Sequence, residues 1–97
     1  MVVTDERNNH RHGDWTGLFK LIEECGECQQ IAGKIAAFPD SDEHPDGAGS
    51  LRERLRNELA DVIAAALHVA QANNLDDNEF RARQLRKLNL FREWMTI

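Results

Sequence analysis

Long apolar runs, cysteine and an excess of basic residues are all missing or scarce in this 97-residue sequence. No stretch approaches the roughly 20 apolar residues that a membrane-spanning helix requires, so we expect no contact with a membrane. The start, MVVTDERNNHRHGD, lacks the apolar segment of a signal peptide, which predicts a cytoplasmic location. Two cysteines are too few for a disulfide scaffold, and reduced thiols are the rule in that compartment.

Basic residues are outnumbered by acids. The 12 lysines and arginines stand against 17 aspartates and glutamates, which gives a formal net charge of −5. A nucleic-acid-binding surface normally carries a basic patch, so we expect no nucleic-acid partner. The length fits a single domain with a modest core, to which association with further copies would add buried surface.

Alternation of apolar and polar residues, the signature of strands, is also missing, so the expected fold class is all-α. Apolar residues at intervals of three and four predict three main helices, over residues 15–38, 51–72 and 80–95. Three polar residues fit N-cap positions, and the second and third have a glutamate three residues later; these are Asp14, Ser50 and Asp76.

Each predicted helix has an apolar face that we expect to be buried. The three faces comprise Leu18, Leu21, Cys25, Cys28, Ala32 and Ile35; Leu51, Leu55, Leu59, Val62, Ala66 and Val69; and Phe80, Leu88, Phe91 and Met95. Three helices of this length cannot bury all these faces by themselves. We therefore expect a homodimer or homotetramer, in which helices of neighbouring subunits complete four-helix-type bundles.

The segments outside the helices are polar. Residues 1–13 are expected to form a flexible N-terminal segment, followed by one helical domain over residues 14–97. Residues 39–50, PDSDEHPDGAGS, contain both prolines and predict a loop. This loop is long for a connection between packed helices, which is typical of a mobile segment or a lid.

Two pairs of carboxylates interrupt the apolar pattern. Glu24 and Glu27 border the apolar stripe of the first helix, Glu58 lies within that of the second, and Asp61 is beside it. Acids at a buried seam are costly unless they are paired or bind a cation. Facing each other, the four would form an oxygen-lined site of the kind that Mg²⁺ or Mn²⁺ prefers. The alternative is a set of solvated acids that pair with Lys20 or Arg54 along their own helices.

These acids also match a family pattern. Glu23-Glu24-Cys25-Gly26-Glu27 followed by Glu58-Leu59-Ala60-Asp61 resembles the E-E-x-x-E and E-x-x-D motifs of the MazG-like all-α nucleoside triphosphate pyrophosphohydrolases. Residues 87–94, KLNLFREW, resemble the N-x-x-R-x-W ending of many relatives. The resemblance covers residues 15–94, although the segment between the two acidic motifs is longer than is usual in short members.

The resemblance implies a hydrolase that converts nucleoside or deoxynucleoside triphosphates to the monophosphate and pyrophosphate. Its magnesium or manganese ion would be held by Glu24, Glu27, Glu58 and Asp61. Glu23 would either complete a second metal site or orient and deprotonate the attacking water. Substrate contacts would come from Trp15, which stacks on the base or else packs in the core, and from Lys20, Lys87, Asn89 and Arg92.

Other motifs receive less weight. Cys25 and Cys28 have the C-x-x-C spacing of redox and zinc motifs, but no βαβ pattern and no further soft ligands accompany them, so we expect buried thiols. His68 is expected to be a packed or surface histidine. A di-iron bundle would show E-x-x-H motifs, which are missing here. The remaining alternative to a hydrolase is a non-catalytic helical partner protein with a structural ion or none.

Overall fold

The computed structural model describes residues 15–95, which form three helices: α1 (Leu18–Ala37), α2 (Leu51–Ala72) and α3 (Asn78–Trp94). Within this range the β pairing is limited to an isolated bridge between Glu43 and Ser50, so the all-α prediction is confirmed. No helix among the described residues is long and apolar enough to cross a membrane. The predictions for residues 1–13 and for an Asp14 cap lie outside the described residues.

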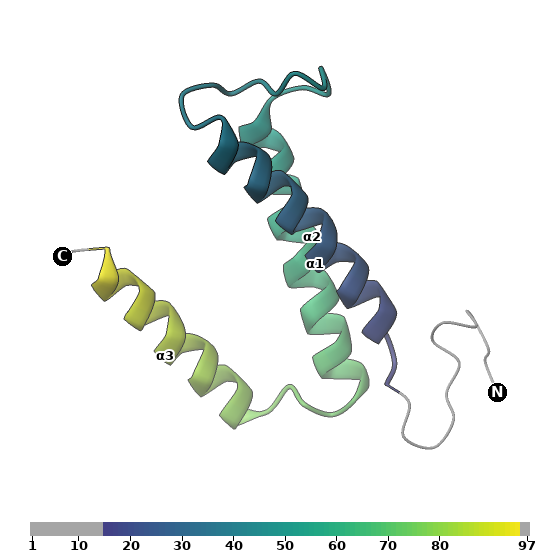
Figure 1. The fold of residues 1–97 in the computed structure, drawn as a ribbon. Coiled ribbons are helices and arrows are strands. Elements are labelled where there is room, and N and C mark those ends of the chain that lie inside the picture. The colour runs from purple at the N-terminus through teal and green to yellow at the C-terminus, as the bar shows by residue number, and fades with distance from the viewer. Residues whose placement is uncertain (1–14, 96–97) are drawn as a thin grey trace.

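The first two helices form an antiparallel hairpin, and α3 stands apart from it. Figure 1 shows α1 and α2 side by side along their whole length, whereas α3 turns back from the end of α2 and diverges from the pair. We refer to α1, α2 and their connecting loop as the hairpin. The close packing between helices in residues 15–95 is therefore that of α1 on α2.

Helix α2 begins where the sequence predicts, directly after the Ser50 cap. The Ser50 side chain accepts a hydrogen bond of 3.2 Å from the backbone N–H of Glu53, and the helix runs from Leu51 to Ala72. The cap of α3 differs by one residue from the prediction. Asp77, rather than Asp76, accepts the bond from the Phe80 N–H at 2.9 Å, because Asp76 pairs with Arg81 instead.

The start of α1 lies three residues later than predicted. Gly17 occupies the N-cap position with a φ of 82°, a left-handed conformation that favours glycine. Just before it, the Thr16 N–H donates to Asn73 Oδ1 at 3.1 Å, and Asn73 Nδ2 donates to the Thr16 carbonyl at 2.9 Å. These two bonds tie residue 16 to the end of α2, so tertiary contacts override the local helical pattern.

The buried seam of the hairpin is rotated relative to the expected apolar faces. The buried apolar residues of the described chain are Ile31, Leu51, Ala65, Val69 and Ala70. On α1 the side of the helix that packs on α2 carries Glu24 and Ile31. Part of the apolar face that the sequence predicts to be buried therefore lies outside the contact. Cys25 is exposed and Cys28 is half-buried, so the prediction of a buried thiol is wrong for Cys25.

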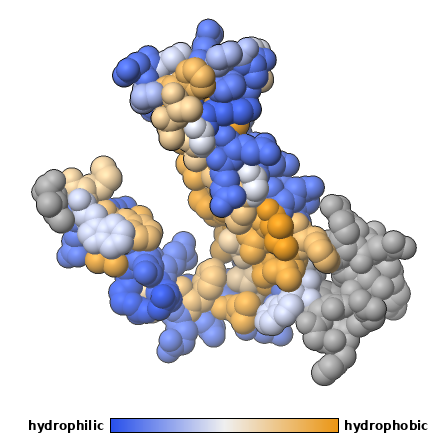
Figure 2. Space-filling model, viewed as in Figure 1, coloured by the Kyte–Doolittle hydropathy of each residue, from blue (hydrophilic) through white to orange (hydrophobic). Residues whose placement is uncertain are grey.

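The apolar residues of α3 are uncovered, contrary to the prediction that its face is buried. No residue of this helix is buried, and Leu88, Phe91 and Met95 are 44%, 48% and 85% exposed. Figure 2 shows apolar surface on α3 and on the side of the hairpin that faces it. The uncovered apolar surface of α3 thus lies opposite an uncovered apolar surface of the hairpin.

Asp46 of the loop between α1 and α2 makes contacts with both helices. Asp46 accepts two parallel hydrogen bonds of 3.1 Å from the guanidinium of Arg54 on α2 and one of 2.8 Å from Lys34 Nζ on α1. It also accepts a bond from the Ala48 N–H, and these contacts hold its pKa far below the ordinary value, chiefly through Arg54 and then Lys34. The loop is thereby joined to both helices that it connects.

Candidate metal centre

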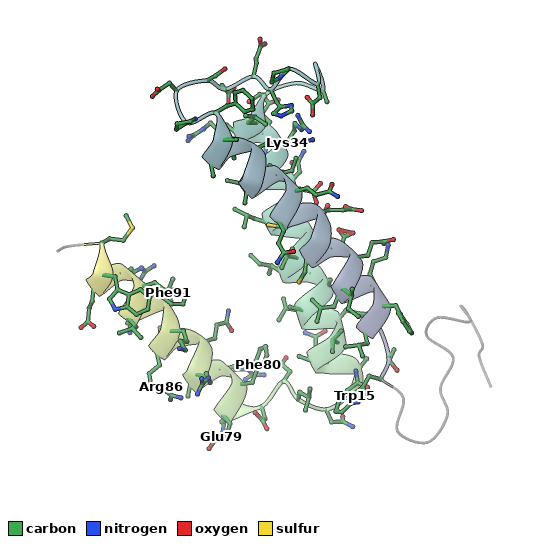
Figure 3. The ribbon with its side chains drawn as sticks, viewed as in Figure 1. Trp15, Lys34, Glu79, Phe80, Arg86 and Phe91 are labelled. Carbon is green, nitrogen blue, oxygen red and sulfur yellow. The ribbon has the colours of Figure 1, made fainter. Side chains whose placement is uncertain are left out.

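The acids of the two motifs meet halfway along the hairpin. Glu24 and Glu27 lie about two turns into α1, and Glu58 and Asp61 lie about two turns into α2. Because the helices are antiparallel, these stretches lie opposite each other. In Figure 3 the loop end of the hairpin is marked by Lys34 and the opposite end by Trp15, and the acids lie between these two ends.

Carboxylate oxygens from both helices come within a distance that one ion could bridge. One oxygen each from Glu24, Glu58 and Asp61 lie within 4.8 Å of one another, and the same holds for Glu23, Glu24 and Glu27. We call these the inter-helix triad and the α1 triad. The structure therefore brings together the five acids that the sequence singled out, and Glu24 belongs to both triads.

Two of these carboxylates have an oxygen without a partner. Oε2 of Glu24 and Oε2 of Glu58 are shielded from solvent and accept no hydrogen bond. A buried polar atom without a partner is unfavourable, and a carboxylate oxygen more so than a neutral one. Both atoms lie in the seam, where a bound cation would satisfy them.

The surroundings of Glu24 oppose its ionisation. Burial against α2 is the main cause of its raised pKa, and the carboxylates of Glu27, Asp61 and Glu58 add to the effect. Lys20, one turn earlier, acts in the opposite direction but is outweighed. Among the described groups, Lys20 therefore compensates the charged form of Glu24 only in part.

Glu58 is in the same situation on the opposite helix. Its pKa is raised first by burial and then by the charges of Glu27 and Asp61, while Arg54 acts weakly against this. The side chain of Glu27 raises the pKa of Glu58 both by its charge and by its hydrogen-bonding contact.

The donor set fits a hard divalent ion. All candidate ligands are carboxylate oxygens, which Mg²⁺ and Mn²⁺ prefer over soft metals. The orphaned oxygens of Glu24 and Glu58 and the mutual repulsion of the acids would both be relieved by such an ion. His68 and the two cysteines belong to neither triad, in agreement with the small weight that the sequence gave them.

Lys20 lies next to the site but is engaged by an acid. Its Nζ is 2.5 Å from Oε1 of Glu23, three residues later on the exposed surface of α1. Pairing of Lys20 with an acid of its own helix, which the alternative to a metal site predicted, is thus present. The acid is Glu23, which belongs to the α1 triad and not to the inter-helix triad.

The other predicted substrate contacts lie away from the acids. Trp15 precedes α1, is 46% exposed and lies more than two turns before Glu24. Lys87, Asn89 and Arg92 are on α3, which diverges from the hairpin, so one chain does not bring them to the triads. The single chain brings together the predicted metal ligands but not most of the predicted phosphate contacts.

The sequence analysis missed the role of Asp46. In the alternative to a metal site Arg54 pairs with acids along α2, whereas in the structure its guanidinium donates to the loop aspartate Asp46. The loop contains three aspartates and lies between Lys34 near the end of α1 and Arg54 near the start of α2, so the sequence does not single out Asp46. Pairing across the loop cannot be derived from helical periodicity, because it depends on the path of the loop.

Comparison with protein-family models, with curated proteins and with solved structures gave no match. The resemblance to MazG-like hydrolases therefore depends on the motif residues of the sequence alone.

Proposed function

We propose that this chain is a magnesium- or manganese-dependent hydrolase that converts nucleoside or deoxynucleoside triphosphates to the monophosphate and pyrophosphate. The observation that carries the proposal is the meeting of Glu24, Glu58 and Asp61 across two helices, with two buried oxygens that lack a partner. Acids that served only solubility would project into water, where such oxygens are satisfied.

The residues have distinct roles in this proposal. Glu24, Glu27, Glu58 and Asp61 would hold the ion, which when bound lowers the pKa of a coordinated water and offsets the charge of the phosphates. Glu23 would orient the attacking water and accept its proton, and its neighbour Lys20 would turn to the phosphate. Water adds to the α-phosphorus, the α–β bond breaks, and pyrophosphate leaves with the electron pair.

A panel of ribo- and deoxyribonucleoside triphosphates with Mg²⁺ or Mn²⁺ tests this proposal. We expect release of pyrophosphate from at least one nucleotide and loss of that activity in Glu58→Gln. Glu53→Gln, an acid of the same helix outside both triads, is the matched control and should retain activity. The absence of turnover with every nucleotide and both metals would favour the alternative, a non-catalytic partner protein.

The uncovered apolar surfaces support the further proposal that the active form is a homodimer or homotetramer. Ile22, Ile63 and Trp94 are each about 60% exposed, which is unfavourable for a chain with so few buried residues.

A further inference from the structure

The C-x-x-C motif of α1 has no role in the proposed function. Cys25 and Cys28 are the two cysteines of the whole chain, so any disulfide within the chain must join them. Both thiols are free, and Cys25 is exposed whereas Cys28 is half-buried. Access to reagents is one condition for a reactive thiol, and Cys25 meets it.

The helix places these two residues at a distance that a disulfide can almost span. Residues three apart in an α-helix have their Cα atoms about 5 Å apart, which is within the range of disulfides. Their Cβ atoms are about 5–6 Å apart, however, whereas a disulfide requires about 4 Å. Cys25 and Cys28 can therefore be joined if the turn between them is deformed by about 1–2 Å.

Gly26 lies in the turn that would have to deform. A Cβ at this position would meet no other atom within 4 Å, so the packing of the described residues does not require a glycine here. Glycine weakens a helix relative to alanine, and this turn is therefore easier to deform than its neighbours.

We propose that Cys25 and Cys28 form a reversible redox pair, which small disulfides such as glutathione disulfide convert to a disulfide within the chain. The exposed Cys25 sulfur attacks one sulfur of glutathione disulfide, and one glutathione leaves as a thiol. The Cys28 sulfur then attacks the Cys25 sulfur of this mixed disulfide and displaces the second glutathione. Two cysteine thiols are oxidised, one glutathione disulfide is reduced to two thiols, and the two protons pass from the cysteines to the glutathiones.

The pair alternates with the acids of the first motif. Glu24 and Glu27 each directly precede a cysteine, so the turn that deforms on oxidation is also the turn that spaces these carboxylates. With Glu23 they form the α1 triad, whose oxygens lie within 4.8 Å of one another. The cysteines belong to neither triad, and their oxidation would act through the backbone of α1.

The expected consequence is weaker binding of a divalent ion by the oxidised chain. This consequence rests on the proposed function, in which these acids hold the ion. A disulfide that forces a helix away from its regular geometry is also the more readily reduced, so reduced glutathione should restore the original state. The redox state of the pair would thereby regulate the metal site.

Intact mass spectrometry of the full chain tests the redox pair without metal or turnover. The reduced protein is incubated with an excess of glutathione disulfide, and the remaining thiols are then alkylated. We expect a chain that has lost the mass of two hydrogen atoms and carries no alkyl group. An excess of reduced glutathione should return two thiols that can be alkylated. A chain that retains a glutathione, copies joined to each other, or two unreacted thiols would overturn the proposal.

Two single variants test the order of attack, with helical circular dichroism as the check of folding. Cys28→Ser should hold one glutathione at Cys25, because the second thiol is missing. Cys25→Ser should react several times more slowly, because Cys28 is half-buried. Equal rates in the two variants would contradict the attack by Cys25.

Calorimetric titration with Mn²⁺ tests the effect on the metal site. We expect the oxidised chain to bind Mn²⁺ about tenfold more weakly than the reduced chain. Cys25→Ser/Cys28→Ser, treated in the same way, is the control and should bind Mn²⁺ equally before and after the treatment. Equal affinity of the oxidised and reduced wild type would overturn the regulation. If the reduced chain binds no Mn²⁺, the proposed function and its regulation fail together, while the mass measurement still decides the redox pair.

Discussion

Glu58 occupies a position in the α1–α2 seam at which an apolar residue would normally stabilise the helix pair. Its buried Oε2 has no partner, and its pKa is raised by burial and by neighbouring acids. We expect Glu58→Gln to raise the apparent Tm of the metal-free protein at neutral pH, because a repulsive charge is removed. The same change should weaken Mn²⁺ binding about tenfold or more.

Calorimetric titration with Mn²⁺ and thermal unfolding in the presence of a chelator measure the two effects. In Glu53→Gln the Mn²⁺ affinity should stay within experimental error of the wild type. A Glu58→Gln protein that binds Mn²⁺ as tightly as the wild type would rule out the inter-helix triad as the metal site.

The raised pKa values of Glu24 and Glu58 also predict how stability depends on pH. Between the ordinary value of 4.5 and the raised value, the folded chain binds more protons than the unfolded chain. The free energy of unfolding of the metal-free protein should therefore decrease as the pH rises above about 4.5. Urea unfolding across this range measures the slope.

A divalent ion should reverse this trend, since it favours the charged carboxylates. We expect Mn²⁺ to stabilise the protein more at pH 7 than at pH 5, and we expect a shallower slope in the Glu24→Gln/Glu58→Gln double variant without metal. An identical pH dependence with and without Mn²⁺ would contradict a metal site at these acids.

Among the connecting segments, the loop that joins α1 to α2 depends on Asp46. Its carboxylate accepts bonds from Arg54, Lys34 and the Ala48 N–H, and its pKa is lowered as a result. We expect Asp46→Asn to lower the Tm by about 4–8 °C, the shift of a small domain on losing a modest interaction. Asp40→Asn, in the same loop, is the control and should have little effect.

The Asp46 effect has a pH signature opposite to that of the seam glutamates. Because the pKa of Asp46 is lowered in the fold, its contribution is complete above the ordinary value of 3.8 and disappears as the pH falls below it. The difference in Tm between the wild type and Asp46→Asn should shrink on acidification below pH 3.8. A difference that is constant with pH would show that packing, not charge, is responsible.

The start of α1 depends on Gly17. A Cβ at this position would lie 2.7 Å from Cδ2 of His68, and the φ of 82° would itself be strained. We expect Gly17→Ala to reduce stability by about 1–2 kcal/mol from the backbone conformation alone, and by more through the clash. Gly17→Ala/His68→Ala should recover the part due to the clash, and a double-mutant cycle by urea unfolding separates the two.

At the level of helices, the sequence was sufficient wherever local signals decide. The Ser50 cap and the limits of α2 follow from capping and periodicity, which also place the acidic motifs next to the apolar faces. The late start of α1, the Asp46 contacts and the exposure of Cys25 do not, because each depends on groups far away in the sequence. Helical periodicity gives the angle between two residues, but not which angle faces the neighbouring helix.

Across residues 15–95, many large apolar side chains are uncovered, which is unfavourable for a monomer. Leu85, Phe91 and Trp94 of α3 are 48–60% exposed, and this helix buries nothing. If a second copy covers these residues, folding and association are coupled. The Tm should then rise with protein concentration, because mass action favours the associated folded state.

Differential scanning calorimetry at two concentrations that differ a hundredfold measures this dependence. Ile63→Glu should have a lower Tm that is independent of concentration. A wild-type Tm that is also constant with concentration would indicate that the chain is stable alone, with α3 as a free arm.

The membership of Glu24 in both triads has a consequence for stoichiometry. Two ions bound at once would have to bridge this one carboxylate, so their occupancies cannot be independent. The first ion would neutralise part of the negative charge that attracts the second ion. Calorimetric titration with Mn²⁺ should therefore give two steps of unequal affinity, and the weaker step should depend on the presence of the anionic substrate. A chain with Gln at position 24 should lose both steps together, which no other single acid of the hairpin is placed to cause.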